Sequence, residues 1–437
     1  MNKFIQTYNK KLTTAKEVVK LIKSDTDVIV GQCASEPQGC MAEFHTVKDK
    51  VKDVKVFSVL TLSPYEFYMN PEMKGHFELC SWFHAEGSRK AIKERTGTVT
   101  YVPNMLHSAG KDRFVVRKPH IFFGTCTPPD HNGFVSLSLG ITYEKDIIEN
   151  CEIVVLEVNN QLPRTLGDTQ LHVDDVDYFV ENHKLPPVLP SPNPDEIALK
   201  IGNYIADLVE DGSTIQLGIG AIPNAAALSL RNKKDLGVHT EMFVDSMMEL
   251  YEMGVITNKL KSIHKGKSIC TFAMGTEKMY KWLDNNPSVE FLRGSYVNDP
   301  CTVRKNSKMI SINTCMMIDF QGQVASEAIG INQYSGTGGQ TDTAVGAIEG
   351  LDGNGKSIIA CRSTAKGGAI STITPMLPQG TAVTLHRSHT DYIVTEFGYA
   401  RLKGLTLRER TTALISIAHP DFRKQLTKQA QEMGYIY

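Results

Sequence analysis

The sequence predicts an α/β protein built from two related open α/β domains. Its 437 residues exceed what one ordinary hydrophobic core holds, so two domains are the natural expectation. A helix-like segment followed by an apolar run and a glycine occurs at 14–31 and again at 195–218. Two halves that open alike indicate two α/β units of the same kind. We therefore expect an N-terminal domain at 1–187 and a C-terminal domain at 195–437.

The expected boundary between the domains is a proline-rich stretch at 185–196. Five prolines fall between residues 186 and 194. Proline lacks a backbone N–H and fixes φ, so such a stretch neither continues a helix nor occupies a central strand. It is typical of a stiff, extended linker.

Composition and charge argue against several function classes. The formal net charge of −1 gives no global attraction for nucleic acid or an anionic membrane. No run of about 18 apolar residues is present, so we expect no transmembrane helix, and the N-terminus lacks the apolar segment of a signal peptide. The nine cysteines are dispersed without a C-x-x-C pair, which favours reduced thiols in a cytoplasmic enzyme. Cys126 stands out because a polar loop follows it.

The first half of the chain alternates helical, apolar and polar segments. A helix is expected over 14–24 with Thr14 as its N-cap. The segment 159–181 is polar and contains proline and glycine, so it is interpreted as a long functional loop. Open α/β sheets place ligand contacts in the loops after their strands. We expect buried strands at 27–30, 54–62, 120–126 and 152–158. Two of these strands are followed by loops that we expect to contact a ligand, at 31–37 and 125–133.

The second half repeats this alternation. A helix begins at Asp195 and leads into an apolar strand that ends in glycine at 218. A strand running into a helix is expected within 267–283, and strands resume within 382–398. A helical segment from Leu405 closes the chain.

Glycine-rich stretches gather in this half, at 218–225, 336–339, 365–369 and 397–404. Glycine lets a backbone approach a ligand closely and turn its N–H groups toward it. One such stretch is explained equally well by a tight turn. Several in one domain, each after an apolar run, favour a ligand with phosphates or a developing oxyanion.

Other chemistries lack their signatures. The string GIGAIPNA carries Pro223 where a dinucleotide fingerprint needs its third glycine, which argues against a nicotinamide-dependent dehydrogenase. Neither a Walker-type phosphate loop nor a G-x-S-x-G elbow occurs. His386 and His389 form the only close histidine pair and lack a carboxylate partner pattern, so no metal site is predicted.

Glu241 follows the first glycine stretch by about twenty residues, in the string HTEMF. Spacing alone leaves two interpretations open. The glutamate is either an exposed or paired side chain, or a nucleophile toward an activated acyl carbon. A carboxylate is ionised at neutral pH and needs no base, but its reaction needs donors for the oxyanion.

Several strings together resemble the acetyl-CoA hydrolase/transferase family of CoA-transferases. In the C-terminal half they are QLGIGAIPNA, HTEMFVD, SGTGGQTD, STAKGG, DYIVTEFGYARLKG and RTTALISIAHPDFRKQL, and in the N-terminal half HIFFGTCTPPDHNGFVSLSLG and QLPRTLGDT. The similarity runs essentially from end to end. Among members, the 4-hydroxybutyrate and butyryl-CoA:acetate CoA-transferases are the most similar type.

The resemblance implies a two-domain CoA-transferase fold with the active site in the cleft between the domains. From their position after strands, we expect the loops 31–37 and 125–133 to close the acyl end of that cleft. It implies ping-pong transfer of CoA between a short-chain acyl-CoA and acetate, through a glutamyl-CoA thioester on Glu241. Gly339 would donate its backbone N–H to the oxyanion. CoA is then a substrate and a covalent intermediate, and no permanent cofactor is expected. The residues implied to contact CoA are Gln216, Leu217, Gly218, Ile219, Gly220, Ser335, Gly339 and Lys366.

Three alternatives stay open at this point: an acyl-CoA hydrolase on the same scaffold, a silent CoA- or nucleotide-binding protein, and a dehydrogenase. Val244 and Ser246 depart from the family pattern, which leaves the acyl preference open. The expected partners are small molecules, acyl-CoA and carboxylic acids, with neither nucleic acid nor membrane. The family also implies a homodimer or a higher homo-oligomer.

Overall fold

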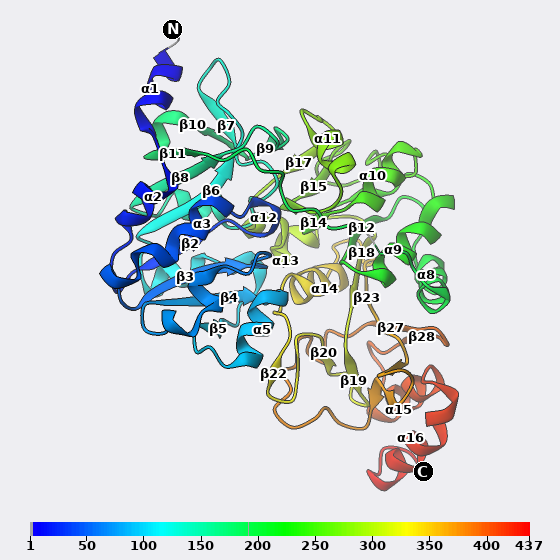
Figure 1. Cartoon of the computed structure of the whole chain (residues 1–437). Helices are drawn as coiled ribbons and strands as arrows, with labels where there is room; N and C mark the ends of the chain where they lie inside the picture. The colour runs from blue at the N-terminus through cyan, green and yellow to red at the C-terminus, as the bar shows by residue number, and fades with distance from the viewer. Residues whose placement is uncertain (1–2, 191) are drawn as a thin grey trace. The chain divides into compact units, whose positions relative to one another are not determined.

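The computed structural model describes residues 3–190 and 192–437 (Figure 1). Met1, Asn2 and, within the proline-rich stretch, Ser191 lie outside the described residues. The chain divides into two compact units. The N-terminal unit extends to Leu189 and includes Ile269–Val297, and the C-terminal unit comprises Pro190–Ser268 and Asn298–Tyr437. The first boundary between the units, after Leu189, lies in the proline-rich stretch.

The segment Ile269–Val297 belongs to the N-terminal unit for two physical reasons. Its strand β17 (Val289–Phe291) pairs in parallel with β9 (Leu166–Gly167). Beyond β17, the Arg293 guanidinium forms ion pairs of 2.5–3.0 Å with three carboxylates of that unit, Asp146, Glu149 and Asp168. Sequence patterns do not report such distant pairings.

The N-terminal unit is organised around an eight-stranded sheet in which all neighbours are parallel. Parallel sheets of this kind are covered on both faces, which is why the strands in the middle of the sheet are almost wholly buried. The spatial order of its strands is β1 (Leu12–Thr13), β11 (Tyr178–Glu181), β8 (Ile153–Val158), β6 (Ile121–Cys126), β2 (Asp27–Val30), β3 (Val54–Val59), β4 (Phe77–Phe83) and β5 (Val99–Tyr101).

The expected strands of the first half are present, but two neighbouring expectations are corrected. The helix expected over 14–24 is shorter, with α2 at Ala15–Val18 and a 3₁₀ turn at Val19–Leu21. The segment 159–181 is not one loop, because β9, β10 (Gln170–His172) and the central-sheet strand β11 all lie in it. Its polar composition concealed these strands.

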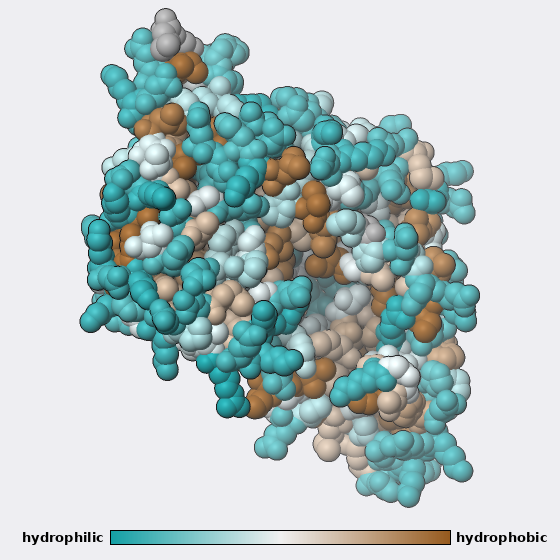
Figure 2. All heavy atoms as spheres, viewed as in Figure 1, coloured by the Kyte–Doolittle hydropathy of each residue, from teal (hydrophilic) through white to brown (hydrophobic). Residues whose placement is uncertain are grey.

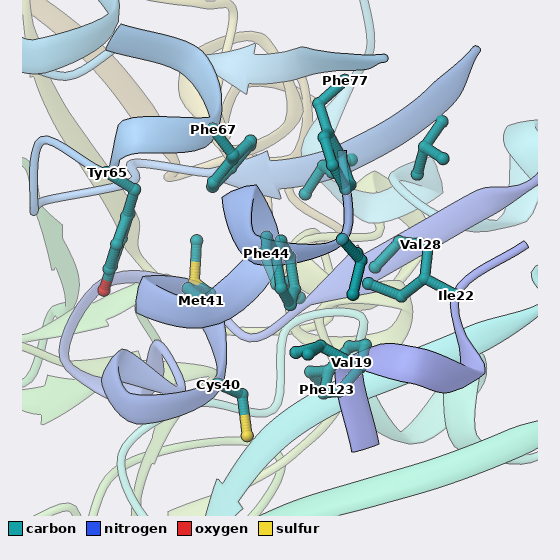
Figure 3. Close-up of a cluster of buried hydrophobic side chains, with 14 of the residues drawn as sticks. Val19, Ile22, Val28, Cys40, Met41, Phe44, Tyr65, Phe67, Phe77 and Phe123 are labelled. Carbon is teal, nitrogen blue, oxygen red and sulfur yellow. The ribbon is translucent and has the colours of Figure 1, made fainter. Parts of the chain in front are cut away.

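Aromatic side chains fill the core beside this sheet (Figure 3). Phe44 lies in the middle of the cluster, with ring centroids 5.1 Å from Phe123, 5.4 Å from Phe67 and 6.2 Å from Phe77. Phe123 comes from β6 and Phe77 from β4, so the cluster joins strands that are far apart in sequence. Buried aromatic pairs of this kind contribute about 0.5–1.5 kcal/mol each beyond the area they bury.

The loops 31–37 and 125–133 meet at the carboxyl edge of this sheet. The chain leaves β2 toward β3 on one side and later adds β6 on the other, so the strand order reverses between β2 and β6. The Gly31 N–H donates to Phe123 O over 2.8 Å, and the Thr125 hydroxyl donates to Ser35 O over 3.2 Å. Open α/β sheets bind ligands at such switch points.

The C-terminal unit has its own six-stranded sheet. All neighbours are parallel except the hairpin that ends it. The order is β13 (Gly237–Val238), β12 (Thr214–Leu217), β18 (Met309–Thr314), β23 (Lys356–Ala360), β27 (Tyr392–Thr395) and β28 (Gly398–Arg401). Its larger helices are α8 (Glu196–Leu208), α9 (Ala221–Ser229), α10 (Asp245–Glu252), α14 (Gln340–Ile348), α15 (Leu407–Ser416) and α16 (Pro420–Glu432).

Local chemistry explains the start of this unit. The helix α8 starts where the sequence predicts, and the Asp195 side chain caps it by accepting the Ala198 N–H over 2.9 Å. The same carboxylate forms a two-pronged ion pair with Arg362, with both N–O distances 2.9 Å. The helix start is thereby tied to the loop that follows β23.

The sequence raised the questions of a membrane-spanning helix and of a metal site, and the surface, the helices and the possible metal ligands are relevant to them. Hydrophilic residues predominate on the face shown in Figure 2, with hydrophobic residues interspersed. Among the described residues, none of the helices combines the length and apolar character needed to cross a membrane. Within residues 3–190 and 192–437, the structure gathers no group of three or more His, Cys, Asp or Glu side chains suited to a metal ion.

Candidate active site

Glu241 lies just beyond the end of β13, at the carboxyl edge of the C-terminal sheet. Side chains fix the strand that carries it. The Val238 N–H donates to Asn258 Oδ1 over 2.9 Å, and Val238 O accepts from the buried Lys261 Nζ over 2.7 Å. The His239 N–H then donates to the neighbouring strand at Ile215 O. The backbone leading to Glu241 is therefore rigidly held.

Two donors of the protein hold the Glu241 carboxylate. Asn298 Nδ2 donates to Glu241 Oε2 over 3.1 Å, and the backbone N–H of Gly339 also hydrogen-bonds this carboxylate. Gly339 is the N-cap of α14, so its N–H lies at the positive end of that helix. A Cβ at position 339 would overlap both Glu241 Oε2 and Asn298 Nδ2, so only glycine allows this approach.

The environment raises the pKa of Glu241 to about 7. Burial is the main cause, since it disfavours the charged form. The hydrogen bond from Asn298 lowers the pKa of Glu241, and the hydrogen bond from Gly339 lowers it further. The charge of Asp342, in the first turn of α14, raises it. The ionised form of Glu241 is therefore less favoured near neutral pH than that of an ordinary glutamate.

A buried glutamate organises the loop that precedes Gly339. Glu327 accepts from the Thr384 hydroxyl over 3.1 Å, from Gln333 Nε2 over 3.1 Å and from the Thr337 hydroxyl over 3.4 Å. Its backbone carbonyl accepts from the Ser335 N–H over 3.2 Å. The expected ligand residue Ser335 is thus half-buried and fixed to Glu327, which fixes the path of the glycine loop.

Gln216 belongs to a buried polar network rather than to an open surface. Its Oε1 accepts from Ser311 Oγ over 3.0 Å, from Asn313 Nδ2 over 3.2 Å and from Thr343 Oγ1 over 3.3 Å. Thr343 Oγ1 also bonds Gly339 O, so the network links β12 and β18 to the start of α14. The neighbouring Leu217 is buried too.

Three of the other expected CoA-contacting residues line a pocket. A pocket of about 540 Å³ lies at the carboxyl ends of β12, β18 and β23, where the strand order of this sheet reverses. Ile219, Gly220 and Lys366 line it, whereas Gly218 directly follows β12. Gly220 has φ +118 and begins α9, so it is a position where glycine is required. The remaining lining includes Pro223, Thr314, Cys315, Met316, Tyr334, Cys361 and Arg362.

The structure thus divides the expected site residues into two groups. Glu241 and Gly339 are in direct contact, and Ile219, Gly220 and Lys366 share the pocket. Asn298 and Glu327 were not anticipated from the sequence, where they lie in the unremarkable strings YVNDP and ASEAI. Cys126 is not part of a site: it is fully buried in β6, and burial raises the pKa of its thiol well above the usual range.

The comparisons with known proteins agree with this architecture. Residues 1–190 match the N-terminal domain of acetyl-CoA hydrolase/transferase, and residues 275–430 match its C-terminal domain. The chain belongs to the acetyl-CoA hydrolase/transferase family. Relatives that share nearly its full length are named CoA-transferases.

Two relatives are named CoA-transferases, one solved structure is similar over the full chain, and a hydrolase is more distantly related. The 4-hydroxybutyrate coenzyme A transferase of Clostridium kluyveri is 42% identical over 97% of this chain and 98% of its own. The butyryl-CoA:acetate CoA-transferase of Anaerostipes caccae is 34% identical over 98% of each chain. The crystal structure of RipA from Yersinia pestis is 34% identical, covers 99% of this chain and 100% of its own, and has a TM-score of 0.92. An acetyl-CoA hydrolase from Neurospora crassa is more distant, 25% identical over 68% of this chain and 62% of its own.

Proposed function

We propose that the protein transfers CoA from a short-chain acyl-CoA to acetate through a thioester on Glu241. The observation that carries this proposal is the pair of donors on the Glu241 carboxylate: Asn298 Nδ2 bonds Oε2 over 3.1 Å, and the Gly339 N–H bonds the same carboxylate. A carboxylate held in this way presents Oε1 as the nucleophile. The names of the two CoA-transferase relatives support butyryl-CoA or 4-hydroxybutyryl-CoA as the donor.

In the first half-reaction, Glu241 Oε1 attacks the thioester carbonyl carbon of the acyl-CoA. The C–S bond breaks, which gives an acyl–glutamyl anhydride and CoA thiolate. The thiolate then attacks the glutamyl carbonyl carbon, the C–O bond to the acyl group breaks, and the first acid leaves as its carboxylate. Glu241 now carries CoA as a thioester.

The second half-reaction runs the same steps in reverse with acetate. The acetate oxygen attacks the glutamyl thioester, CoA thiolate leaves, and the thiolate then attacks the acetyl carbonyl of the new anhydride. Acetyl-CoA departs and the Glu241 carboxylate is restored. One thioester replaces another, so the overall exchange needs no ATP.

The chain's donors have a defined role in this sequence. When the thiolate or acetate attacks the glutamyl carbonyl, negative charge develops on the glutamyl oxygen that the protein holds. The Gly339 N–H and Asn298 Nδ2 already bond this side chain before the reaction, so they need little rearrangement to stabilise the charge. Removing one such donor typically costs about 10²–10³ in kcat.

The pocket beside Ile219 and Gly220 supplies a place for part of CoA. It lies at the N-terminus of α9, where backbone N–H groups and the helix dipole favour anions. Lys366 adds a positive charge on an exposed hairpin. Gln216 and Leu217 are buried in β12 and help to fix that strand. Gly218 lies in the turn after β12, and Ser335 and Gly339 lie in the glycine loop before α14.

The test compares acyl-CoA turnover with and without acetate. We expect consumption of butyryl-CoA to require acetate and to yield acetyl-CoA in equal amount. Release of free CoA at the full rate without acetate would instead establish a hydrolase. Glu241→Gln should abolish transfer, whereas the exposed Glu249→Gln on α10 should retain it.

A further inference from the structure

Two cysteines lie side by side at the carboxyl edge of the C-terminal sheet. Cys315 directly follows β18 and Cys361 directly follows β23. These strands are parallel neighbours whose last paired residues are Thr314 and Ala360, and the Cys315 N–H continues the ladder to Ala360 O over 3.1 Å. The two cysteines are therefore the next register pair, with side chains on the same face of the sheet.

The thiols are in contact. A side-chain hydrogen bond joins Cys315 to Cys361, and the Cys361 sulfur also lies 3.8 Å from Thr372 Oγ1. Neighbouring strands are about 4.8 Å apart, which is within the range of Cα separations that a disulfide spans, about 4.4–6.8 Å.

Both sulfur-bearing residues line the pocket described above. Cys315 is half-buried and Cys361 is buried, so a dissolved reagent meets Cys315 first. A disulfide between adjacent strands is strained, and strained disulfides are the easily reduced, regulatory kind. The mechanism proposed for Glu241 uses neither thiol.

We propose that Cys315 and Cys361 form a redox-active pair that the disulfide of CoA oxidises, and that the resulting disulfide switches off CoA transfer. This rests on the proposed function in one respect, namely that the pocket binds the CoA portion of the substrate. The pocket then admits the oxidised form of the same molecule to the thiol pair.

The chemistry balances without a further reagent. The hydrogen bond with Cys361 and burial raise the pKa of the Cys315 thiol, so Cys315 must first lose its proton to solvent. Its sulfur then attacks one sulfur of CoA disulfide, the S–S bond breaks, and one CoA thiolate leaves. Cys361, after losing its proton, attacks the Cys315 sulfur of the mixed disulfide and expels the second CoA thiolate. The two protein thiols lose two electrons and two protons, and CoA disulfide is reduced to two CoA thiols.

The experiment treats the reduced full-length protein with CoA disulfide and analyses it by intact mass and peptide mapping without reductant. We expect a cross-linked peptide pair containing Cys315 and Cys361, at least a tenfold loss of transfer rate, and recovery with dithiothreitol. Cys361→Ser should stop the reaction at a mixed disulfide with one CoA on Cys315. Cys301→Ser, which removes an exposed thiol elsewhere, should behave like the unaltered protein.

Two results would overturn the proposal. One is oxidation that maps to Cys301 or other cysteines without the Cys315–Cys361 cross-link. The other is the cross-link with the transfer rate unchanged. If the reduced protein has no transfer activity, that result contradicts the proposed function instead. The cross-link, together with calorimetric measurement of CoA binding, would then still show whether Cys315 and Cys361 form the redox pair.

Discussion

Asn298 Nδ2 donates a hydrogen bond over 3.1 Å to Glu241 Oε2. With the Gly339 N–H bonded to the same carboxylate, this contact makes the two oxygens of Glu241 unequal. In the proposed reaction Oε2 stays with Asn298 while Oε1 attacks the substrate. The proposed chemistry depends on the contacts that Asn298 and Gly339 make with this carboxylate.

Replacing Gly339 with alanine should damage catalysis more than folding. Alanine tolerates the φ of −96 at this position, but its Cβ would overlap Glu241 Oε2 and Asn298 Nδ2. The carboxylate must then move away from its donors. We expect kcat to fall by about 10²–10³, as for loss of an oxyanion donor. Steady-state kinetics with butyryl-CoA and acetate measure the effect.

Gly350→Ala is the matched control for that variant. It lies just past the other end of α14, and its Cβ would meet its nearest neighbour, Ala347 O, at 3.1 Å. It should leave kcat within a few-fold of the unaltered protein. If both variants lose activity equally, helix damage rather than site geometry explains the loss.

Asn298→Asp should shift the pH dependence of activity toward alkaline pH. The nucleophile is the ionised form of Glu241, whose pKa is raised to about 7, so kcat/KM should rise with pH and level off above about 7. A second carboxylate in place of the Asn298 amide removes a hydrogen bond that lowers this pKa and adds a like charge. We expect the midpoint of the kcat/KM profile to move up by at least about one pH unit.

This prediction is contradicted if Asn298→Asp lowers kcat but leaves the midpoint of the kcat/KM profile against pH unchanged. That result would mean that Asn298 acts only by filling space beside Glu241. Asn298→Ala separates the two effects, because it removes the hydrogen bond without adding charge, and its midpoint should fall between those of the other two proteins.

Glu241→Gln should stabilise the fold at alkaline pH. The pKa of Glu241 is raised from 4.5 to about 7, so between these values the folded state binds more protons than the unfolded state. Stability therefore falls as pH rises through this window, and the loss is complete above about 7. At 1.36 kcal/mol per pH unit, the penalty reaches up to about 3 kcal/mol, less whatever solvent contact relieves.

Urea unfolding at pH 5 and pH 8 measures that difference. The glutamine variant should gain stability over the unaltered protein at pH 8 and little at pH 5. Glu249→Gln, at an exposed site on the helix that follows, should show no comparable pH-dependent gain. An equal effect of Glu241→Gln at both pH values would contradict a raised pKa.

Glu327→Ala should loosen the loop before Gly339. It removes the acceptor for the side chains of Thr384, Gln333 and Thr337, and leaving such groups unpaired costs about 1–3 kcal/mol. We expect faster hydrogen exchange over residues 333–339, with a raised KM for acyl-CoA and a lowered kcat. The exposed Glu349→Gln at the end of α14 should change neither. Unaltered exchange in this loop would show that Glu327 does not hold it.

Much of the architecture was predictable because it rests on local patterns. Apolar runs correctly located β2, β6 and β12, and the apolar spacing from Asp195 onward correctly located the start of α8. The fold class and the family followed from the same strings and are confirmed by the two matching domains and the RipA structure. Local propensity and turn chemistry suffice for such features.

The parts that were not predictable depend on contacts across the sequence. Asn298 is 57 residues from Glu241, and nothing in its local string indicates that its amide reaches a carboxylate. Glu327 resembles any surface glutamate in the sequence, yet it is buried. The raised pKa of Glu241 likewise arises from burial and from Asp342, about a hundred residues further along the chain, a proximity that only the folded chain creates.

The most direct test of the central claim is the site of covalent CoA attachment. The protein is incubated with butyryl-CoA in the absence of acetate, acidified, and analysed by intact mass and by peptide mapping. We predict one CoA attached per chain, mapped to Glu241, and no CoA attached to the Glu241→Gln variant. When acetate is added before the acid, the attached CoA should be released as acetyl-CoA. CoA found on any other residue, or turnover without a covalent adduct, would contradict the glutamyl-CoA mechanism.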